Sequence, residues 1–190
     1  RKDEHRIAVV TASNVYVRSG GGDSYYPFGK MKKGDLVEVI GEKYGWAHVL
    51  TRGPSFDGFF GYIRSMPNQT VRFKVDATGT KGRTEGPADL LAANLNSNYK
   101  PSDSWKRILA MPGGVELSVL ETIETNEMTV HKVRLPEDAR GWISARYLEP
   151  ATAGQVAIWT EQIAARKRGE QGKDKTAKQT DADVTPAGTV

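Results

Sequence analysis

The 190-residue chain carries 27 Lys and Arg residues against 23 Asp and Glu residues, a formal net charge of +4. It has no cysteine, which excludes disulfides, thiolate metal sites and cysteine nucleophiles. Acidic and basic residues are interspersed, which argues against a nucleic-acid partner, and no apolar run approaches the ~18 residues that a transmembrane segment needs. The length suits two small domains and a tail.

Residues 7 to 66 show the pattern of several short β-strands. Val15 and Val17 alternate with polar neighbours, as in a half-buried strand, and a second β-rich run covers residues 36–40. A glycine between successive runs marks a tight reversal in each case. Five such strands are enough to close a small barrel, which removes the exposed edges of a short sheet.

Four ordered motifs in this region resemble bacterial Src-homology-3-like (SH3b) domains. They are Asn14-Val15-Tyr16-Val17-Arg18-Ser19-Gly20, Lys33-Gly34-Asp35-Leu36-Val37-Glu38-Val39, Gly45-Trp46-Ala47-His48-Val49 and Gly61-Tyr62-Ile63. The opening motif has one residue more than the shortest family pattern. The resemblance covers roughly residues 10 to 66 and implies an SH3-like barrel. It implies a binding role without naming the ligand, because this small barrel serves many partners.

A second copy follows at a constant shift. Residues 67–87 resemble a linker with one strand, where Val71, Phe73 and Val75 alternate between turn-forming residues. Moving the sequence by 80 positions then places Asn14 on Asn94, Met31 on Met111, Gly34 on Gly114, Val39 on Val119, Gly61 on Gly141 and Ile63 on Ile143. This internal duplication predicts a second, divergent SH3-like barrel over residues 88–150. The predicted fold class is therefore all-β, with two small SH3-like barrels in tandem.

The C-terminal part has a different pattern. Apolar residues at Val156, Trp159 and Ile163 have helical spacing, which predicts an amphipathic helix over residues 153–168. After Gly169 the sequence has almost nothing to bury, so we expect a disordered tail over residues 169–190.

Nothing in the sequence forms a catalytic or metal-binding motif. Neither His48 nor His131 belongs to a metal or catalytic pattern, and their equivalent positions on predicted strands place them on an outer face. The acids of the first repeat are scattered over turns, which disfavours a paired-carboxylate glycosidase. We therefore expect a protein that is not an enzyme and that has no cofactor and no metal.

Aromatic residues are the informative ones, because ten of the 16 in the chain fall in the first repeat. A barrel of this size cannot bury ten large rings at native packing density. One hypothesis is that the surplus lines a ligand-binding groove, since flat rings offer contact area at little entropic cost. The candidate groove residues are Tyr16, Tyr25, Tyr26, Phe56 and Phe59, with Trp46 as core or groove floor. The alternative is that these rings pack against the second repeat or the helix.

The leading hypothesis is a non-enzymatic binding module of the bacterial cell envelope that docks a protein or peptidoglycan peptide, with no nucleic acid and no transmembrane segment. The resemblance implies this class. It favours a periplasmic or extracellular location, although Arg1 is equally explained by a removed signal peptide or a trimmed end. The alternative is a structural subunit of a larger assembly, with both barrels and the helix as contact surfaces. A wall hydrolase is the least supported hypothesis.

Overall fold

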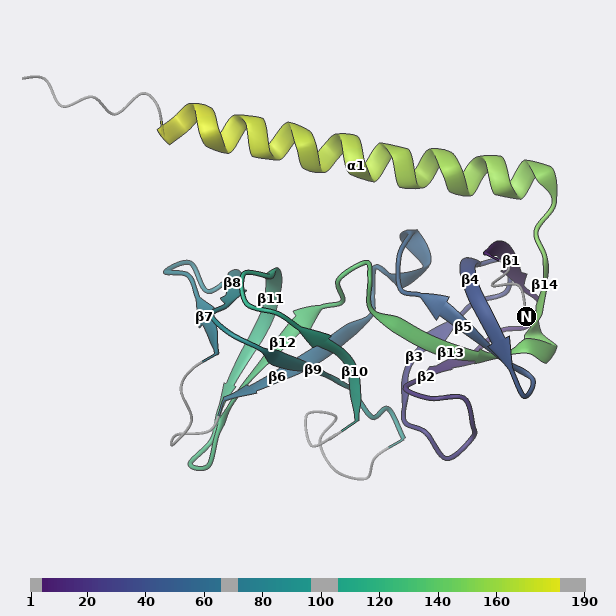
Figure 1. Ribbon diagram of the computed structural model, residues 1–190, viewed down its shortest axis with the longest axis horizontal. Helices are drawn as coiled ribbons and strands as arrows, with labels where there is room; N and C mark the ends of the chain where they lie inside the picture. Colours follow the sequence, from purple (N-terminus) through teal and green to yellow (C-terminus); the bar gives the residue numbers. More distant parts are fainter. Residues whose placement is uncertain (1–4, 66–71, 97–105, 182–190) are drawn as a thin grey trace, which may run out of the picture. The chain divides into compact units, whose positions relative to one another are not determined.

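The computed structural model describes residues 5–65, 72–96 and 106–181 and is mostly β (Figure 1). Residues up to 151 form one compact unit of two seven-stranded sheets, and the rest forms a second, helical unit. The all-β class is therefore confirmed for the first unit. Two short 3-10 turns, Pro54–Phe56 and Ala145–Tyr147, lie next to strands of this unit.

The first sheet has the strand order β14-β1-β4-β5-β13-β2-β3, and its described neighbours pair antiparallel. Its strands, in chain order, are β1 (Arg6–Val10), β2 (Val15–Arg18), β3 (Pro27–Met31), β4 (Leu36–Lys43), β5 (Trp46–Leu50), β13 (Arg140–Ser144) and β14 (Leu148–Pro150).

The second sheet has the strand order β10-β9-β6-β12-β11-β8-β7. Its strands, in chain order, are β6 (Phe60–Ser65), β7 (Phe73–Val75), β8 (Lys81–Thr84), β9 (Ala88–Ala92), β10 (Arg107–Met111), β11 (Glu116–Glu124) and β12 (Thr129–Arg134). The runs predicted as strands at residues 36–40 and 116–120 are thus confirmed as parts of β4 and β11.

The two sheets are built alike, but each takes its central closing strand from the other half of the sequence. Strand β13 pairs with β5 and β2 of the first sheet, and β6 pairs with β12 and β9 of the second. Figure 1 shows green β13 beside the blue and purple strands and blue β6 beside the green and teal ones. The predicted boundaries at residues 66 and 88 assigned residues 60–65 to the first repeat as its closing strand. In the structure these residues form β6 of the second sheet instead.

Side-chain packing fixes the exchange. A Cβ atom added at Gly141 would lie 2.5 Å from Cγ1 of Val17 and 3.0 Å from the Phe28 ring, both in the first repeat. A Cβ atom at Gly61 would instead lie 2.9 Å from Leu90 of the second repeat. Each closing strand therefore fits closely against the core to which it has moved.

The two connections between the sheets run side by side, joined by Thr51. The Thr51 amide donates to the carbonyl of Ala139 at 2.9 Å, and its hydroxyl lies 3.0 Å from the Pro136 carbonyl and 3.1 Å from that of Ala139. Thr51 is 3% exposed, so these hydrogen bonds satisfy groups that are otherwise shielded from water.

Both sheets contain the same glycine turn, as the duplication predicts. Gly34 and Gly114 have φ angles of 91° and 90°, a conformation that strongly favours glycine. Their amides donate to the carbonyls of Val10 at 2.8 Å and of Thr84 at 2.6 Å, so each turn is fastened to the equivalent strand of its own sheet.

The structure differs from the sequence prediction at two places in the second repeat, the linker and the opening strand. The linker holds two paired strands, β7 and β8, where one was predicted; Val71 lies outside the described residues. Strand β8 was missed because Gly82 weakens the strand pattern, but a Cβ there would lie 2.2 Å from the Phe73 ring, so the ring covers the glycine. The second opening strand is β9, earlier than the Asn94 motif that the shift of 80 predicts.

The helix α1 (Ala153–Asp181) is longer than predicted. It continues through Gly169 into residues that were expected to be disordered, because a glycine costs a helix only about 1 kcal/mol and no proline occurs between Ala151 and Pro186. Residues 182–190 of the expected tail lie outside the described part of the chain. No helix among the described residues combines the length and the apolar character that crossing a membrane requires.

The exchange predicts that a substitution in β13 destabilises the first sheet. Gly141→Ala places a methyl group against Val17 and Phe28, and we expect a loss of about 1–3 kcal/mol in the free energy of unfolding, measured by urea denaturation. Gly41→Ala in β4 is the control, because a Cβ there meets nothing within 4 Å. Equal effects of the two substitutions would contradict the close packing of β13.

Candidate functional site

A cavity of about 370 Å³ opens at the end of the first sheet where β2, β5 and the turn after β13 meet. Its aromatic walls are Tyr16, Trp46 and Tyr147, all partly exposed. Its remaining lining residues are Ala12, Ser13, Asn14, Val15, Arg18, Asp23, Ser144 and Arg146. We call this cavity the Tyr16 cleft.

Backbone hydrogen bonds hold the walls of the Tyr16 cleft in place. The amide of Thr11 donates to the carbonyl of Tyr147 at 2.9 Å, and the amide of Ala145 donates to that of Gly45 at 2.8 Å. Trp46 is paired with Ser144 in the β5–β13 ladder. The cleft is thus assembled from both ends of the sequence and depends on the position of β13.

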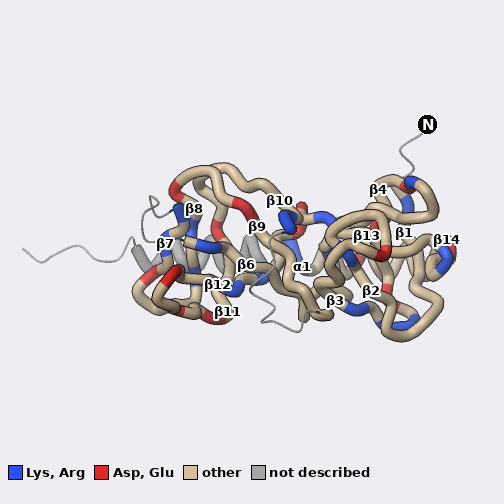
Figure 2. The backbone as a smooth tube through the Cα atoms, turned by 90° about the horizontal axis from the view of Figure 1, so that it is seen from below, with Lys and Arg blue, Asp and Glu red and all other residues tan. Residues whose placement is uncertain are grey.

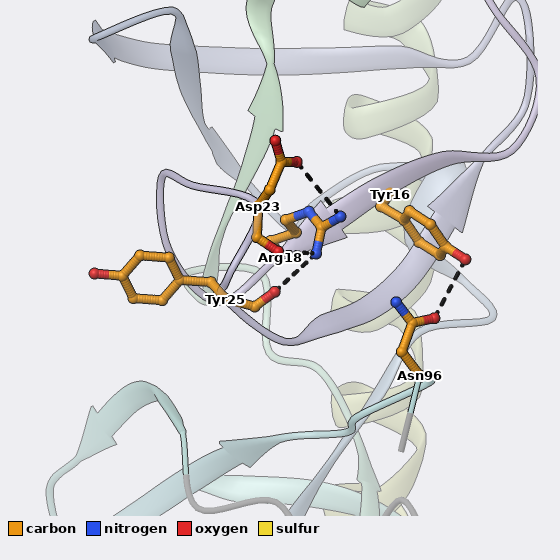
Figure 3. A network of polar contacts seen from close by, with 5 residues as sticks. All are labelled: Tyr16, Arg18, Asp23, Tyr25 and Asn96. Atoms are coloured by element: carbon orange, nitrogen blue, oxygen red, sulfur yellow. Dashed lines mark hydrogen bonds and ion pairs between the residues drawn. The ribbon is translucent and has the colours of Figure 1, made fainter. Parts of the chain in front are cut away.

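Arg18 ties the loop after β2 to the Tyr16 wall (Figure 3). One guanidinium nitrogen donates to the carbonyls of Asp23 at 3.1 Å and Tyr25 at 2.8 Å, and the other lies 3.6 Å from the Asp23 carboxylate. The guanidinium carbon is 5.2 Å from the centroid of the Tyr16 ring. Charged hydrogen bonds and ring contact together fix Arg18, whose side chain is only 12% exposed.

Tyr16 is also fixed at its far end. Its hydroxyl lies 3.3 Å from Oδ1 of Asn96, as Figure 3 shows, and the Lys30 ammonium lies 5.1 Å from its ring centroid. Because two cations contact this ring and one hydrogen bond holds its hydroxyl, the Tyr16 side chain loses little further conformational freedom when a ligand binds.

Arg146 provides the positive charge that remains available at the rim. It is exposed and stacks over Tyr147, with 4.6 Å from the guanidinium carbon to the ring centroid. Within the described part of the chain it forms no ion pair, whereas Arg18 is paired with Asp23. The cleft therefore combines aromatic walls with one guanidinium that can receive a carboxylate.

Of the six residues predicted for the groove, the structure brings only Tyr16 and Trp46 together in this cleft. Phe56 and Phe59 are 5% and 7% exposed, with ring centroids 5.0 Å apart. Both belong to a core cluster that includes Ala92 and Val130 of the second sheet. These two rings are therefore buried in a core that both sheets share, and Phe59 also meets Phe28 and the Gly29 backbone of the first repeat.

Tyr25 and Tyr26 lie beside the cleft and are not among its lining residues. The Tyr25 ring is 42% exposed, covers the backbone at Gly20 and points away from Arg18 and Tyr16 (Figure 3). Tyr26 is half-buried, and its carbonyl accepts a hydrogen bond from the amide of Ser19 at 2.9 Å. Both tyrosines therefore stabilise the loop after β2 and do not line the cavity.

Sequence reasoning missed Ser144, Arg146 and Tyr147, because they were assigned to the second repeat. A signal was present in the sequence: Gly141-Trp142-Ile143 has the same Gly-aromatic-Ile form as Gly61-Tyr62-Ile63, so either segment could close either repeat. Closing the first repeat with the later segment would have placed these residues at the cleft.

A stacked pair of rings lies on the first sheet next to the cleft. The His48 and Trp142 ring centroids are 4.3 Å apart with an interplanar angle of 9°, and a Cβ added at Gly21 would lie 3.1 Å from the Trp142 ring. Burial, followed by the positive charge of Arg140, lowers the pKa of His48. His48 was expected on an outer face, and it is partly covered there.

His131 was expected on an outer face, but it is buried. It is 7% exposed, lies 5.2 Å from the Phe73 ring centroid, and its Nδ1 lies 3.1 Å from the Thr122 hydroxyl. Burial lowers its pKa, and Glu124 opposes that shift.

No group of three or more His, Asp or Glu residues lies together as a metal site among the residues that the structure describes. Comparisons with protein-family models, with curated proteins and with solved structures found no match to this chain. The cleft must therefore be interpreted from its own residues.

The histidines predict a pH dependence of stability. Because the folded protein lowers the pKa of His48, the unfolded chain binds more protons below the ordinary value of 6.5. Stability should therefore fall as pH decreases from 6.5 through the lowered pKa and be independent of this group above 6.5. In thermal unfolding at pH 7 and pH 5, His48→Gln should lose less stability than the wild type on acidification. The same loss in both proteins would contradict the assignment.

Proposed function

We propose that the protein is a non-enzymatic binding module that docks a peptide segment in the Tyr16 cleft. The observation that carries this proposal is the convergence, on one cavity of about 370 Å³, of three partly exposed rings and of Arg146, which forms no ion pair with any residue that the structure describes. Rings that are already fixed give contact area at low entropic cost, and cavities of this size accommodate one or two side chains of a peptide.

The SH3-like interpretation of the fold belongs to the same proposal. The four motifs of the first repeat, the duplication and the matching strand orders of the two sheets support a pair of SH3-like barrels with exchanged closing strands. This interpretation supports a binding role. It does not identify the ligand, because such a barrel serves many functions, so the ligand is inferred from the residues of the cleft.

The cleft chemistry favours a ligand that carries a carboxylate. Arg146 presents its guanidinium beside Tyr147 at the rim. Asp23, the one acid among the described residues that line the cavity, is paired with Arg18. Peptides of peptidoglycan and acidic or C-terminal protein segments all offer carboxylates on a short extended chain. The family resemblance supports the cell envelope, in a periplasmic or extracellular location, as the setting.

The second candidate function is a structural subunit of a larger assembly. The observation in its favour is the 29-residue helix α1, which exposes Val156 and Ile158. Apolar residues on an exposed helix are suited to a contact with another protein.

Sedimentation with insoluble peptidoglycan tests the binding module. We expect the wild type to sediment with the polymer and Tyr16→Ala or Trp46→Ala to lose most of this retention, about tenfold or more, because each removes an aromatic wall. Tyr44→Ala is the matched control, since Tyr44 is 89% exposed and lies outside the cleft lining.

Thermal unfolding of each variant separates lost binding from lost folding. Undiminished retention of both cleft variants, or an equal loss with Tyr44→Ala, would count against the cleft. If the wild type itself does not sediment, peptidoglycan is excluded as the ligand and the assembly function gains support.

A further inference from the structure

A second groove, of about 400 Å³, lies between strand β3 and the connection that leaves the first sheet after β5. Its floor is aromatic, formed by Phe28, Phe59 and Phe60, and Pro54 and Leu95 form part of its walls. The Phe28 and Phe59 rings meet edge to face at 6.0 Å, so the floor is rigid. Leu95 is 39% exposed at the rim and offers an apolar contact to a ligand.

The rim of this groove is basic. Lys30 and Lys32 line it, and the Lys132 ammonium lies 4.2 Å from the centroid of the Phe60 ring on its floor. None of these three lysines forms an ion pair within the described residues. Lys30 lies within β3, where Figure 2 colours Lys and Arg positions of the backbone blue.

Asp35 is the one acid among the described residues of the lining, and it does not offset this charge fully. One carboxylate oxygen of Asp35 accepts a hydrogen bond from the backbone amide of Lys32 at 2.8 Å, which holds the acid in its own turn. The described lining thus has two ammonium groups against one carboxylate, and the Lys132 ammonium adds a third over the Phe60 ring. An incoming negative charge is attracted by such a rim, and an apolar side chain by the floor.

The backbone at this groove also suits an extended ligand. Strand β3 is the last strand of its sheet among the described residues, and the Leu95 amide donates to the Pro27 carbonyl at one end of it, at 2.9 Å. An edge strand beside an apolar groove can receive an added strand, with its side chains alternating between groove and solvent.

We propose that this groove docks an acidic peptide segment of a partner protein, with one apolar side chain between Phe60 and Leu95 and flanking carboxylates at Lys30, Lys32 and Lys132. Phe28 and Phe59 are 1% and 7% exposed and form the closed base of the groove, and the Lys132 ammonium lies over the partly exposed Phe60 ring. The described lining therefore offers no series of open ring faces on which nucleotide bases could stack. The charge therefore points to peptide carboxylates. This groove stands on its own residues and does not require that the Tyr16 cleft bind a ligand.

The test is fluorescence polarisation with the full chain and a labelled peptide, acetyl-Glu-Asp-Leu-Phe-Asp-Glu, beside a matched peptide with Gln and Asn in place of the acids. We expect the acidic peptide to bind at least about tenfold more tightly than the neutral one, and Lys32→Glu to weaken it about tenfold. Lys33→Glu is the control: it has the same charge change at the next residue, and Lys33 is exposed and outside the groove lining.

Two further variants separate this groove from the first site. Leu95→Ser should weaken binding of the acidic peptide, whereas Trp46→Ala, which alters only the Tyr16 cleft, should weaken it less than Leu95→Ser or Lys32→Glu does. The proposal is overturned if the acidic and neutral peptides bind alike, if Lys33→Glu weakens binding as much as Lys32→Glu does, or if Trp46→Ala weakens it as much as Lys32→Glu does. Displacement of the peptide by a single-stranded oligothymidine at equal concentration would also overturn it, in favour of a general polyanion surface.

Discussion

The packing of β13 against Val17 and Phe28 is the contact on which the rest of the structure depends. It completes the first sheet with a strand that begins at Arg140, whereas the preceding strand of that sheet, β5, ends at Leu50. The whole second sheet is therefore inserted in the sequence between these two paired strands. The two repeats form one compact unit, and the two connections between the sheets are joined at Thr51.

The same exchange creates both candidate binding surfaces. In the Tyr16 cleft, Ser144, Arg146 and Tyr147 come from the turn that follows β13, and they face Tyr16 and Trp46 of the first repeat. In the second groove, the connection after β5 carries Pro54 and Phe59 across the edge strand β3. An arrangement in which each repeat kept its own closing strand would remove the wall of the first and the floor of the second.

Local features of the fold could be predicted from the sequence, and the pairing of strands could not. The glycine turns at Gly34 and Gly114 and the runs that became β4 and β11 have clear patterns, because a φ angle near 90° and a half-buried strand each restrict residue type locally. The closing strands carry Gly-Tyr-Ile and Gly-Trp-Ile, which have the same period and nearly the same shape. Periodicity shows which face of a strand is buried and contains no information on which sheet it joins.

The candidate site shows the same limit. Tyr16 was predicted because surplus rings had to reach the surface, and Trp46 was predicted as core or groove floor. Counting ring volume does not say which of the ten rings reach the surface. Phe56 and Phe59 are buried because the connection that carries them passes over the first sheet on its way to the second, and Phe59 covers the backbone of Gly29 in β3 at a distance that no Cβ would allow. That path is a long-range property, and no local pattern specifies it.

The exchange of closing strands is tested most directly by disulfide formation, since the chain has no native cysteine. Leu50 and Arg140 are partners in the β5–β13 ladder, a separation that a disulfide can bridge, whereas an unexchanged closing strand would place Phe60 opposite Leu50. Under mild oxidation, the Leu50→Cys/Arg140→Cys variant should form an intramolecular disulfide and the Leu50→Cys/Phe60→Cys variant should remain reduced. The reverse result would contradict the exchange.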